Sequence, residues 1–402
     1  MMALWLLSTF IAVIIAWYIG YRMRLEKIIT QKSNLPRDYL MGLNFLLNEE
    51  PDKAVDIFIK MLEVDSQVVE THLAVGKLFR RRGEVDRAIR IHQNLIARPQ
   101  LDKTYHEQSL FELGQDYLSA GMLDRAERIF LELVVLKEYI IPALRALLDI
   151  YQQEKAWENA IRTAEKLEAA TRKKMRMVIA HYYCELAEIT YAKGQVDKSS
   201  KYANEALDID AKCVRASLLQ AKFAMTKNDF KSALRSLKRV KNQNPEYLSE
   251  SIDALASCYE ALNEEKELVT YLMELLDEYP RVPVVLILSE RIRQWKGDKI
   301  AAKFVADYVR RYPSLAGINL FINLYISNAE GRAREDLLIL QGLMQKLLAD
   351  KPNYQCVSCG FSGNTLHWLC PGCKQWDSIK PLYSDALSHT EQKGVMPAKA
   401  GI

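Results

Sequence analysis

The stretch GKLFRRRGEVDRAIRIHQNLI, residues 76–96, decides the fold of this 402-residue chain, because its pattern of small and large residues recurs along most of the sequence. Gly76 is followed by Phe79, Ala88 and His92, and the same grid reappears every 33 to 39 residues. The equivalent positions are Gly42, Phe45, Ala54 and Phe58; Gly114, Tyr117, Ala126 and Phe130; Leu148, Tyr151, Ala160 and Ala164; and, in shorter form, Ala187 with Ser199, Ala221 with Ala233, Ala256 with Tyr259 and Ser289 with Ala301.

This period, with a small residue in a first helix and alanine in a second, resembles the tetratricopeptide repeat. Small residues let the two helices approach closely, and large apolar ones fill the seam. We predict eight repeats over residues 35–313 and a further helical pair over 314–350. Glycines at the expected turns should end helices with positive φ, and prolines should close three repeats. These residues are Gly83, Gly121, Gly194 and Gly297, and Pro245, Pro280 and Pro313.

Repeats of this kind bury their apolar faces only by stacking, so we expect an all-α superhelix with a concave groove. Side chains of the first helices that lie outside the seam should line this groove. The candidates for partner binding are Lys77, Arg80, Arg81, Phe111, Arg145, His181, Arg215 and Lys222. The basic ones could grip acidic partner segments. The alternative for each is an ordinary solvated surface residue.

Two CxxC pairs stand near the C-terminus, Cys356 with Cys359 and Cys370 with Cys373. This spacing is typical of two knuckles that close one tetrahedral four-thiolate metal site. Residues 352–383 are too few to fold on a hydrophobic core alone, so a metal ion should supply most of their stability.

The metal-binding segment looks like a rubredoxin-type or zinc-ribbon domain. Four thiolates can hold one zinc or one iron ion, and iron would permit electron transfer. We favour structural zinc, because the spacer between the pairs is short and electron carriers are usually free domains. Trp368, Trp376 and Tyr354 should form a small aromatic core or a face that docks onto the last helices.

Residues 1–21 carry no charged side chain and are long enough to span a bilayer as a helix. Basic residues follow in the predicted juxtamembrane linker, 22–34, so the positive-inside rule places the rest of the chain in the cytoplasm. A cleaved signal peptide is the alternative, but it would need its positive charges before the apolar stretch. The sequence thus predicts a single-pass membrane protein with its bulk in the cytoplasm.

Composition narrows the class of protein further. The net charge of +4 is too small to favour a nucleic-acid binder. Three single cysteines, Cys184, Cys213 and Cys258, do not form a secreted disulfide framework and should be small buried residues in a reducing compartment. We find no phosphate loop, nucleophile elbow or HExxH, so the chain reads as a scaffold and not an enzyme. Residues 384–402 look like a disordered tail.

The order of these features resembles the lipopolysaccharide assembly protein B (LapB/YciM) family of Gram-negative bacteria. The resemblance is most specific in residues 76–96, in AHYYCELA (180–187) and in CVSCGFSGNTLHWLCPGCKQWDSIKP (356–381). It implies a non-catalytic inner-membrane adaptor that presents the lipid A pathway deacetylase LpxC to the membrane protease FtsH for degradation. It also implies contacts with regulatory membrane proteins and is compatible with a homo-oligomer.

Two other functions remain open at this point. The chain could be a scaffold that assembles lipopolysaccharide biosynthetic enzymes without directing proteolysis. It could also be a rubredoxin-like electron carrier, if the four thiolates hold iron. A zinc-ribbon nucleic-acid binder is disfavoured by the near-neutral charge.

Overall fold

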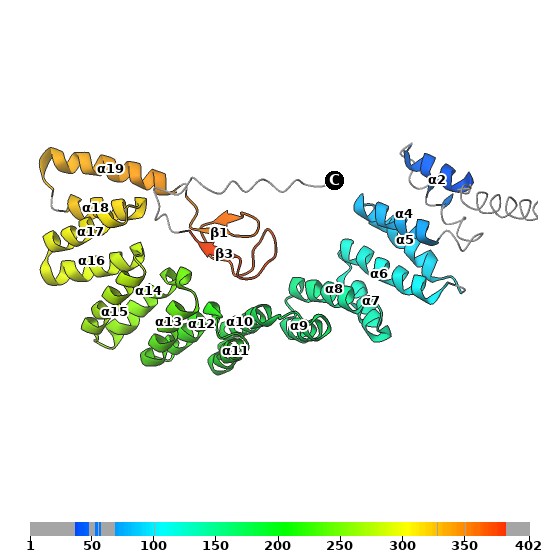
Figure 1. The fold of residues 1–402 in the computed structure, drawn as a ribbon, viewed down its shortest axis with the longest axis horizontal. Helices are drawn as coiled ribbons and strands as arrows, with labels where there is room; N and C mark the ends of the chain where they lie inside the picture. The colour runs from blue at the N-terminus through cyan, green and yellow to red at the C-terminus, as the bar shows by residue number, and fades with distance from the viewer. Residues whose placement is uncertain are drawn as a thin grey trace, which may run out of the picture. The chain divides into compact units, whose positions relative to one another are not determined.

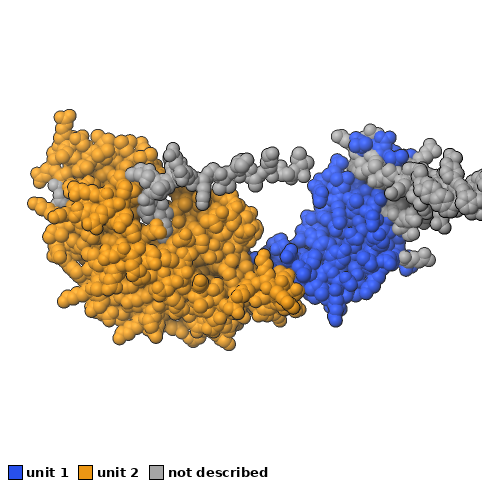
Figure 2. All heavy atoms as spheres, in the orientation of Figure 1, with its two compact units in different colours: residues 1–155 blue, residues 156–402 orange. Residues whose placement is uncertain are grey.

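The fold comes from a computed structural model, which describes residues 37–47, 53–54, 56–57, 69–99, 101–327, 329–349 and 351–382. The chain divides into two compact units, 1–155 and 156–402, which Figure 2 colours separately.

The described part of the first unit is helical (Figure 1). Its helices are α2 (Arg37–Leu47), α4 (Val69–Arg81), α5 (Val85–Ile96), α6 (Lys103–Ser119), α7 (Leu123–Leu136) and α8 (Ile140–Gln153). Each helix from α4 to α8 packs on the next one along the chain. First helices also contact first helices, α4 with α6 and α6 with α8, as stacked helical pairs require.

The second unit continues the same architecture and ends in a small sheet (Figure 1). Its helices are α9 (Trp157–Thr171), α10 (Arg176–Ala192), α11 (Val196–Ile209), α12 (Val214–Thr226), α13 (Phe230–Gln243), η2 (Pro245–Tyr247), α14 (Ser249–Ala261), α15 (Glu265–Glu278), α16 (Val282–Lys296), α17 (Asp298–Arg311), α18 (Leu315–Ile326) and α19 (Gly331–Ala349). The predicted helical repeats are confirmed. Their division into eight stays a prediction.

Close approach of paired helices explains the small residues of the grid. A Cβ atom on Gly76 in α4 would lie 2.4 Å from Nε2 of His92 in α5. In the next pair, a Cβ on Gly114 would lie 2.7 Å from Cε1 of Phe130. Real Cβ atoms do not approach other heavy atoms so closely, so glycine at these positions sets the spacing of the helices.

The turns within the pairs carry left-handed backbone, as predicted. Gly83, Gly121, Gly194 and Gly297 have φ between 72° and 84°. Where the grid lacks glycine, other residues adopt the same conformation: Lys155, Asn228 and Asn263 have φ of 55° to 58°. Asparagine tolerates this conformation better than most residues, because its short side chain bonds locally. These turns were not predictable from glycine alone.

The C-terminal segment forms a three-stranded antiparallel sheet of strand order β2-β1-β3. The strands are β1 (Tyr354–Cys356), β2 (Ser362–Gly363) and β3 (Ile379–Pro381). The chain is therefore all-α with a small four-cysteine strand domain, here called the ribbon (residues 352–382). The ribbon packs against η2 through β3.

The predicted membrane span (1–21), its linker (22–34) and the tail (384–402) lie outside the described residues. Among the helices that are described, none is long and apolar enough to cross a bilayer. The longest of them, α19, has 19 residues and includes Arg332, Arg334, Glu335, Asp336 and Lys346. On this finding the predicted single-pass inner-membrane localisation, with the bulk of the chain in the cytoplasm, is corrected and withdrawn.

Candidate metal centre and its docking face

Two knuckles of matching backbone geometry present the cysteines of the ribbon. In the first, the amide of Gly360 donates to the carbonyl of Cys356 over 3.0 Å. In the second, the amide of Lys374 donates to the carbonyl of Cys370 over 3.0 Å. Gly360 and Lys374 both have positive φ, 78° and 57°. Equivalent turns at the two CxxC pairs make the segment a two-knuckle metal fold.

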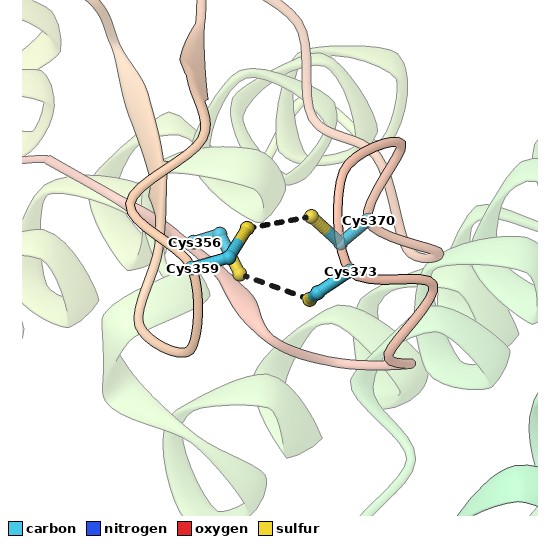
Figure 3. A group of neighbouring side chains, drawn as sticks. All are labelled: Cys356, Cys359, Cys370 and Cys373. Atoms are coloured by element: carbon cyan, nitrogen blue, oxygen red, sulfur yellow. Dashed lines mark hydrogen bonds between the residues drawn. The ribbon is translucent and has the colours of Figure 1, made fainter. Parts of the chain in front are cut away.

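The four cysteine sulfurs converge on one point between the knuckles (Figure 3). The Sγ atoms of Cys356 and Cys373 are 3.7 Å apart, and those of Cys359 and Cys370 are 3.6 Å apart. All four lie within 4.8 Å of one another. A tetrahedral ion with metal–sulfur bonds of about 2.3 Å requires sulfur–sulfur edges of roughly 3.8 Å. The cluster therefore fits one tetrahedral metal ion.

Electrostatics within the cluster favour a bound cation. Desolvation opposes ionisation of Cys356, but hydrogen bonding to Ser378 and to the amides of Cys359 and Ser358 lowers the pKa of this thiol to about 6. The Phe361 amide favours the Cys359 thiolate. Desolvation and the neighbouring cysteine sulfurs outweigh it and raise the pKa of Cys359 to about 11. The cluster alone thus resists carrying several thiolates, and a divalent cation would relieve that repulsion.

Small residues leave room for the sulfurs. A Cβ on Gly372 would lie 3.2 Å from Sγ of Cys359 and 3.9 Å from Sγ of Cys370. A side chain there would crowd Cys359 of the first knuckle. The predicted ligands Cys356, Cys359, Cys370 and Cys373 can therefore hold one metal ion together.

Trp376, three residues after the last cysteine, docks the ribbon on the helices. Its ring stacks on His181 of α10 at 5.0 Å between centroids with an interplanar angle of 18°. It meets Tyr182 and Trp157 edge-on at 5.7 and 6.2 Å. The guanidinium of Arg215 in α12 lies 6.0 Å from the Trp376 ring centroid. Only 7% of the Trp376 side chain is exposed, so it is the main apolar anchor of the ribbon.

A second contact surrounds Tyr247 of η2, which is fully buried. Trp368 lies over its ring, with the centroids 5.2 Å apart. The Tyr247 hydroxyl is 2.8 Å from Oδ1 of Asp377 and 2.9 Å from the carbonyl of Ile379, both acceptors. Lys380 donates to the same hydroxyl from 3.0 Å. Burial and the nearby Asp377 carboxylate raise the pKa of Tyr247, so the phenol stays protonated and able to donate.

The ribbon therefore docks on the middle of the second unit. Its contacts lie on α9, α10, α12, η2 and α14, the last through a hydrogen bond of 2.8 Å from Tyr354 to Glu250. The expectation of a face docked onto the last helices is wrong in its location. The surface of α9, α10, α12 and η2 that contacts Trp368 and Trp376 is called the docking face below.

Two carboxylates balance the buried positive charge of the docking face. Arg215 is 4% exposed and forms ion pairs with Glu185 at 2.8 Å and Glu188 at 3.0 Å. Burial, together with the charges of Arg215 and Lys380, lowers the pKa of His181 to about 3. The imidazole is therefore neutral when Trp376 stacks on it. These two predicted groove residues hold the chain's own ribbon.

The remaining predicted partner-binding residues lie elsewhere. Lys77 contacts Glu112 at 2.9 Å, and Arg80 contacts both Glu112 and Asp116 at 2.7 Å. These ion pairs link α4 to α6 and raise the pKa of Arg80 against the cost of its burial.

Phe111 stacks on Tyr139, with their centroids 5.2 Å apart. Arg81, Arg145 and Lys222 are exposed. A role for any of them in partner binding stays a prediction.

Sequence reasoning missed the helical half of this site. Tyr247, Glu250, Trp157 and Tyr182 all contact the ribbon, yet none stands out from its repeat by spacing or composition. The sequence signal for docking lies in the ribbon, which is very small and carries two tryptophans, Trp368 and Trp376, close to its knuckles. Such large rings need a partner surface that the ribbon cannot provide.

Fold and site define the class of protein: a tetratricopeptide-repeat protein that carries a docked four-cysteine metal-binding domain. Residues 354–381 match the rubredoxin metal binding domain family, and residues 71–104 match the tetratricopeptide repeat.

The chain is 36% identical to the lipopolysaccharide assembly protein B of Escherichia coli (strain K12) over 373 residues, which cover 92% of this chain and 96% of that protein. The protein of the same name from Haemophilus influenzae is 35% identical over 383 residues, which cover 92% of this chain and 96% of that protein. The chain belongs to the lipopolysaccharide assembly protein B family.

Proposed function

We propose that this chain is a non-catalytic adaptor in lipopolysaccharide biosynthesis, which promotes degradation of the deacetylase LpxC by the protease FtsH. The observation that carries the proposal is the similarity, over 92% of the chain, to proteins named for lipopolysaccharide assembly. The roles of FtsH and LpxC come from the family resemblance noted from the sequence. Repeat surfaces suit the holding of protein partners.

Features of the site favour a role in binding protein partners over a role in catalysis. His181, whose pKa burial lowers to about 3, is stacked on Trp376 and also contacts Trp368. The cysteine cluster has the geometry of a closed four-ligand site, which leaves no position for a substrate. We propose that partners bind the repeat surface, where Arg81, Arg145 and Lys222 are exposed. These basic side chains would bind acidic segments of a partner.

The ion in the ribbon is proposed to be one structural zinc held by Cys356, Cys359, Cys370 and Cys373. Bound there, it would cross-link the two knuckles. Elemental analysis of anaerobically purified protein should give one zinc per chain and no visible absorption. A visible thiolate-to-iron absorption band with one iron per chain would instead support the electron carrier.

The function is tested by the half-life of LpxC in cells depleted of this protein. Depletion should lengthen the half-life severalfold, and restoring the wild-type chain should shorten it again. Cys356→Ser should fail to restore it, because the knuckles lose a ligand. Val357→Ser is the matched control, since this neighbouring side chain is 73% exposed and should restore degradation fully.

A half-life that does not respond to depletion would reject the adaptor proposal. The scaffold then becomes the better account, and it predicts that two or more lipopolysaccharide biosynthetic enzymes co-purify with the wild-type chain. Restoration by Cys356→Ser to the level of Val357→Ser would keep the adaptor but remove the metal centre from its action.

A further inference from the structure

Helix α19, which lies next to α18 (Figure 1), has an apolar face that no described helix covers. None of its residues is buried, although it packs against α18. Five large aliphatic side chains are about half exposed or more: Leu338 at 46%, Ile339 at 64%, Leu340 at 48%, Leu343 at 53% and Leu347 at 55%. The last four of these are called the α19 stripe.

The α19 stripe is a continuous surface of the helix. Leu340, Leu343 and Leu347 follow at intervals of three and four residues, which places them on one side of a helix. The residues less exposed to solvent, Leu337, Met344 and Leu348, lie on the side toward α18. A helix at the end of a repeat array normally turns a polar face outward. An outward row of leucines therefore indicates that the α19 stripe binds another protein surface.

Two of the exposed charges of α19 fit an antiparallel pair of α19 helices. Asp336 and Lys346 are exposed and lie five residues before and five residues after Gln341. At 100° per residue both fall on the same side of the helix as the stripe. An antiparallel pair with its two-fold axis at Gln341 places Asp336 of one copy opposite Lys346 of the other, twice. The same register places Ile339 opposite Leu343.

We propose that α19 binds α19 of a second copy of this chain, antiparallel, with the α19 stripe as the buried seam. A parallel pair would set like charges opposite each other at both positions. One pair of 19-residue helices is a small interface, so we expect a dissociation constant on the order of micromolar. The proposal does not rest on the adaptor function and concerns only self-association.

The test is sedimentation velocity of the full chain from about 1 to 200 µM, a range chosen around the expected micromolar dissociation constant. Leu343→Glu should weaken self-association roughly a hundredfold, because each copy buries a charge near the axis. Asp336→Lys and Lys346→Asp should each weaken it about three- to tenfold, by placing like charges opposite each other twice. The double exchange Asp336→Lys/Lys346→Asp should restore the wild-type constant.

A matched control is Gln345→Lys, an exposed position on another side of the same helix, which should leave the constant unchanged. Restoration by the double exchange is specific, since an unrelated partner surface would be repelled by it. Self-association that ignores Leu343→Glu, or a double exchange as weak as the single ones, would overturn the proposal. A wild-type chain that stays monomeric throughout the range would overturn it as well.

Discussion

Replacing Trp376 by alanine removes the side chain that anchors the ribbon to α10 and α12. The ring is 7% exposed and contacts His181, Tyr182, Trp157 and Arg215. Truncation of a buried tryptophan to alanine costs about 3–5 kcal/mol. Because an ion held by the four cysteines, and not the tryptophan, would close the knuckles, we expect this cost to fall on docking, while the ribbon keeps its metal.

A cost of about 4 kcal/mol corresponds to a roughly thousandfold larger population of undocked ribbon. Hydrogen exchange read by mass spectrometry measures this population directly in segments that become exposed. Amides of β3 and of the docking face around Tyr247 should lose protection by that factor. Amides of α16 and α17 should exchange as in the wild type, and the protein should still bind one metal ion per chain.

Trp295→Ala is the matched control, because Trp295 lies on α16 and is 47% exposed. It removes the same side chain without touching the docking face. If Trp376→Ala changes protection of the ribbon by less than tenfold, or no more than Trp295→Ala does, the reasoning on docking is refuted. Loss of the metal ion together with docking would show instead that the knuckles need the docking face to close.

Three further substitutions test other parts of the structure. Gly76→Ala should lower the free energy of unfolding by about 1–3 kcal/mol, because the new Cβ would lie 2.4 Å from the imidazole of His92. Gly342→Ala, where a Cβ meets open space, should be neutral or stabilising. Equal changes in stability for the two variants would contradict the close approach of α4 and α5. Burial lowers the pKa of His181 to about 3, so below pH 6.5 the unfolded state binds a proton that the folded state does not, and the free energy of unfolding falls by about 1.4 kcal/mol for each unit that the pH drops towards 3. Denaturation at pH 7.5 and 5.5 should therefore show a smaller loss of stability for His181→Gln than for the wild type. Equal losses in the two proteins would count against a buried neutral imidazole. Tyr247→Phe removes the hydroxyl that bonds the ribbon and should weaken docking by about 1–2 kcal/mol, measured by exchange of β3 amides, with unchanged exchange as the contrary result.

The parts of the fold that the sequence predicts are those set by local spacing. Gly76 and Gly114 mark close helix pairs because each faces a bulky residue sixteen positions later in the same repeat. The four cysteines predict a common centre because CxxC fixes the geometry of each knuckle separately. Both signals lie within a few tens of residues, where periodicity and turn chemistry constrain the chain directly.

Docking of the ribbon could not be predicted in the same way. The hydrogen bond from Tyr247 joins residues 130 positions apart, and no period connects η2 to Asp377. His181 and Arg215 do lie on a contact surface of the helices, as the repeat grid indicates, but their neighbour is Trp376 of the same chain. The repeat pattern predicts which side chains lie outside the seam between paired helices. It does not predict which residues those side chains contact.

Metal binding and docking share structural elements, so they should be linked energetically. Trp376 follows Cys373 by three residues, and Trp368 precedes Cys370 by two, so the second knuckle carries both docking tryptophans. An ion that fixes this knuckle also fixes the position of the two rings that meet His181 and Tyr247. By reciprocity, contacts that hold the rings in place favour the metal-bound knuckle by the same free energy. The docking face and the ribbon are then thermodynamically coupled, so loss of docking should weaken the metal site without emptying it.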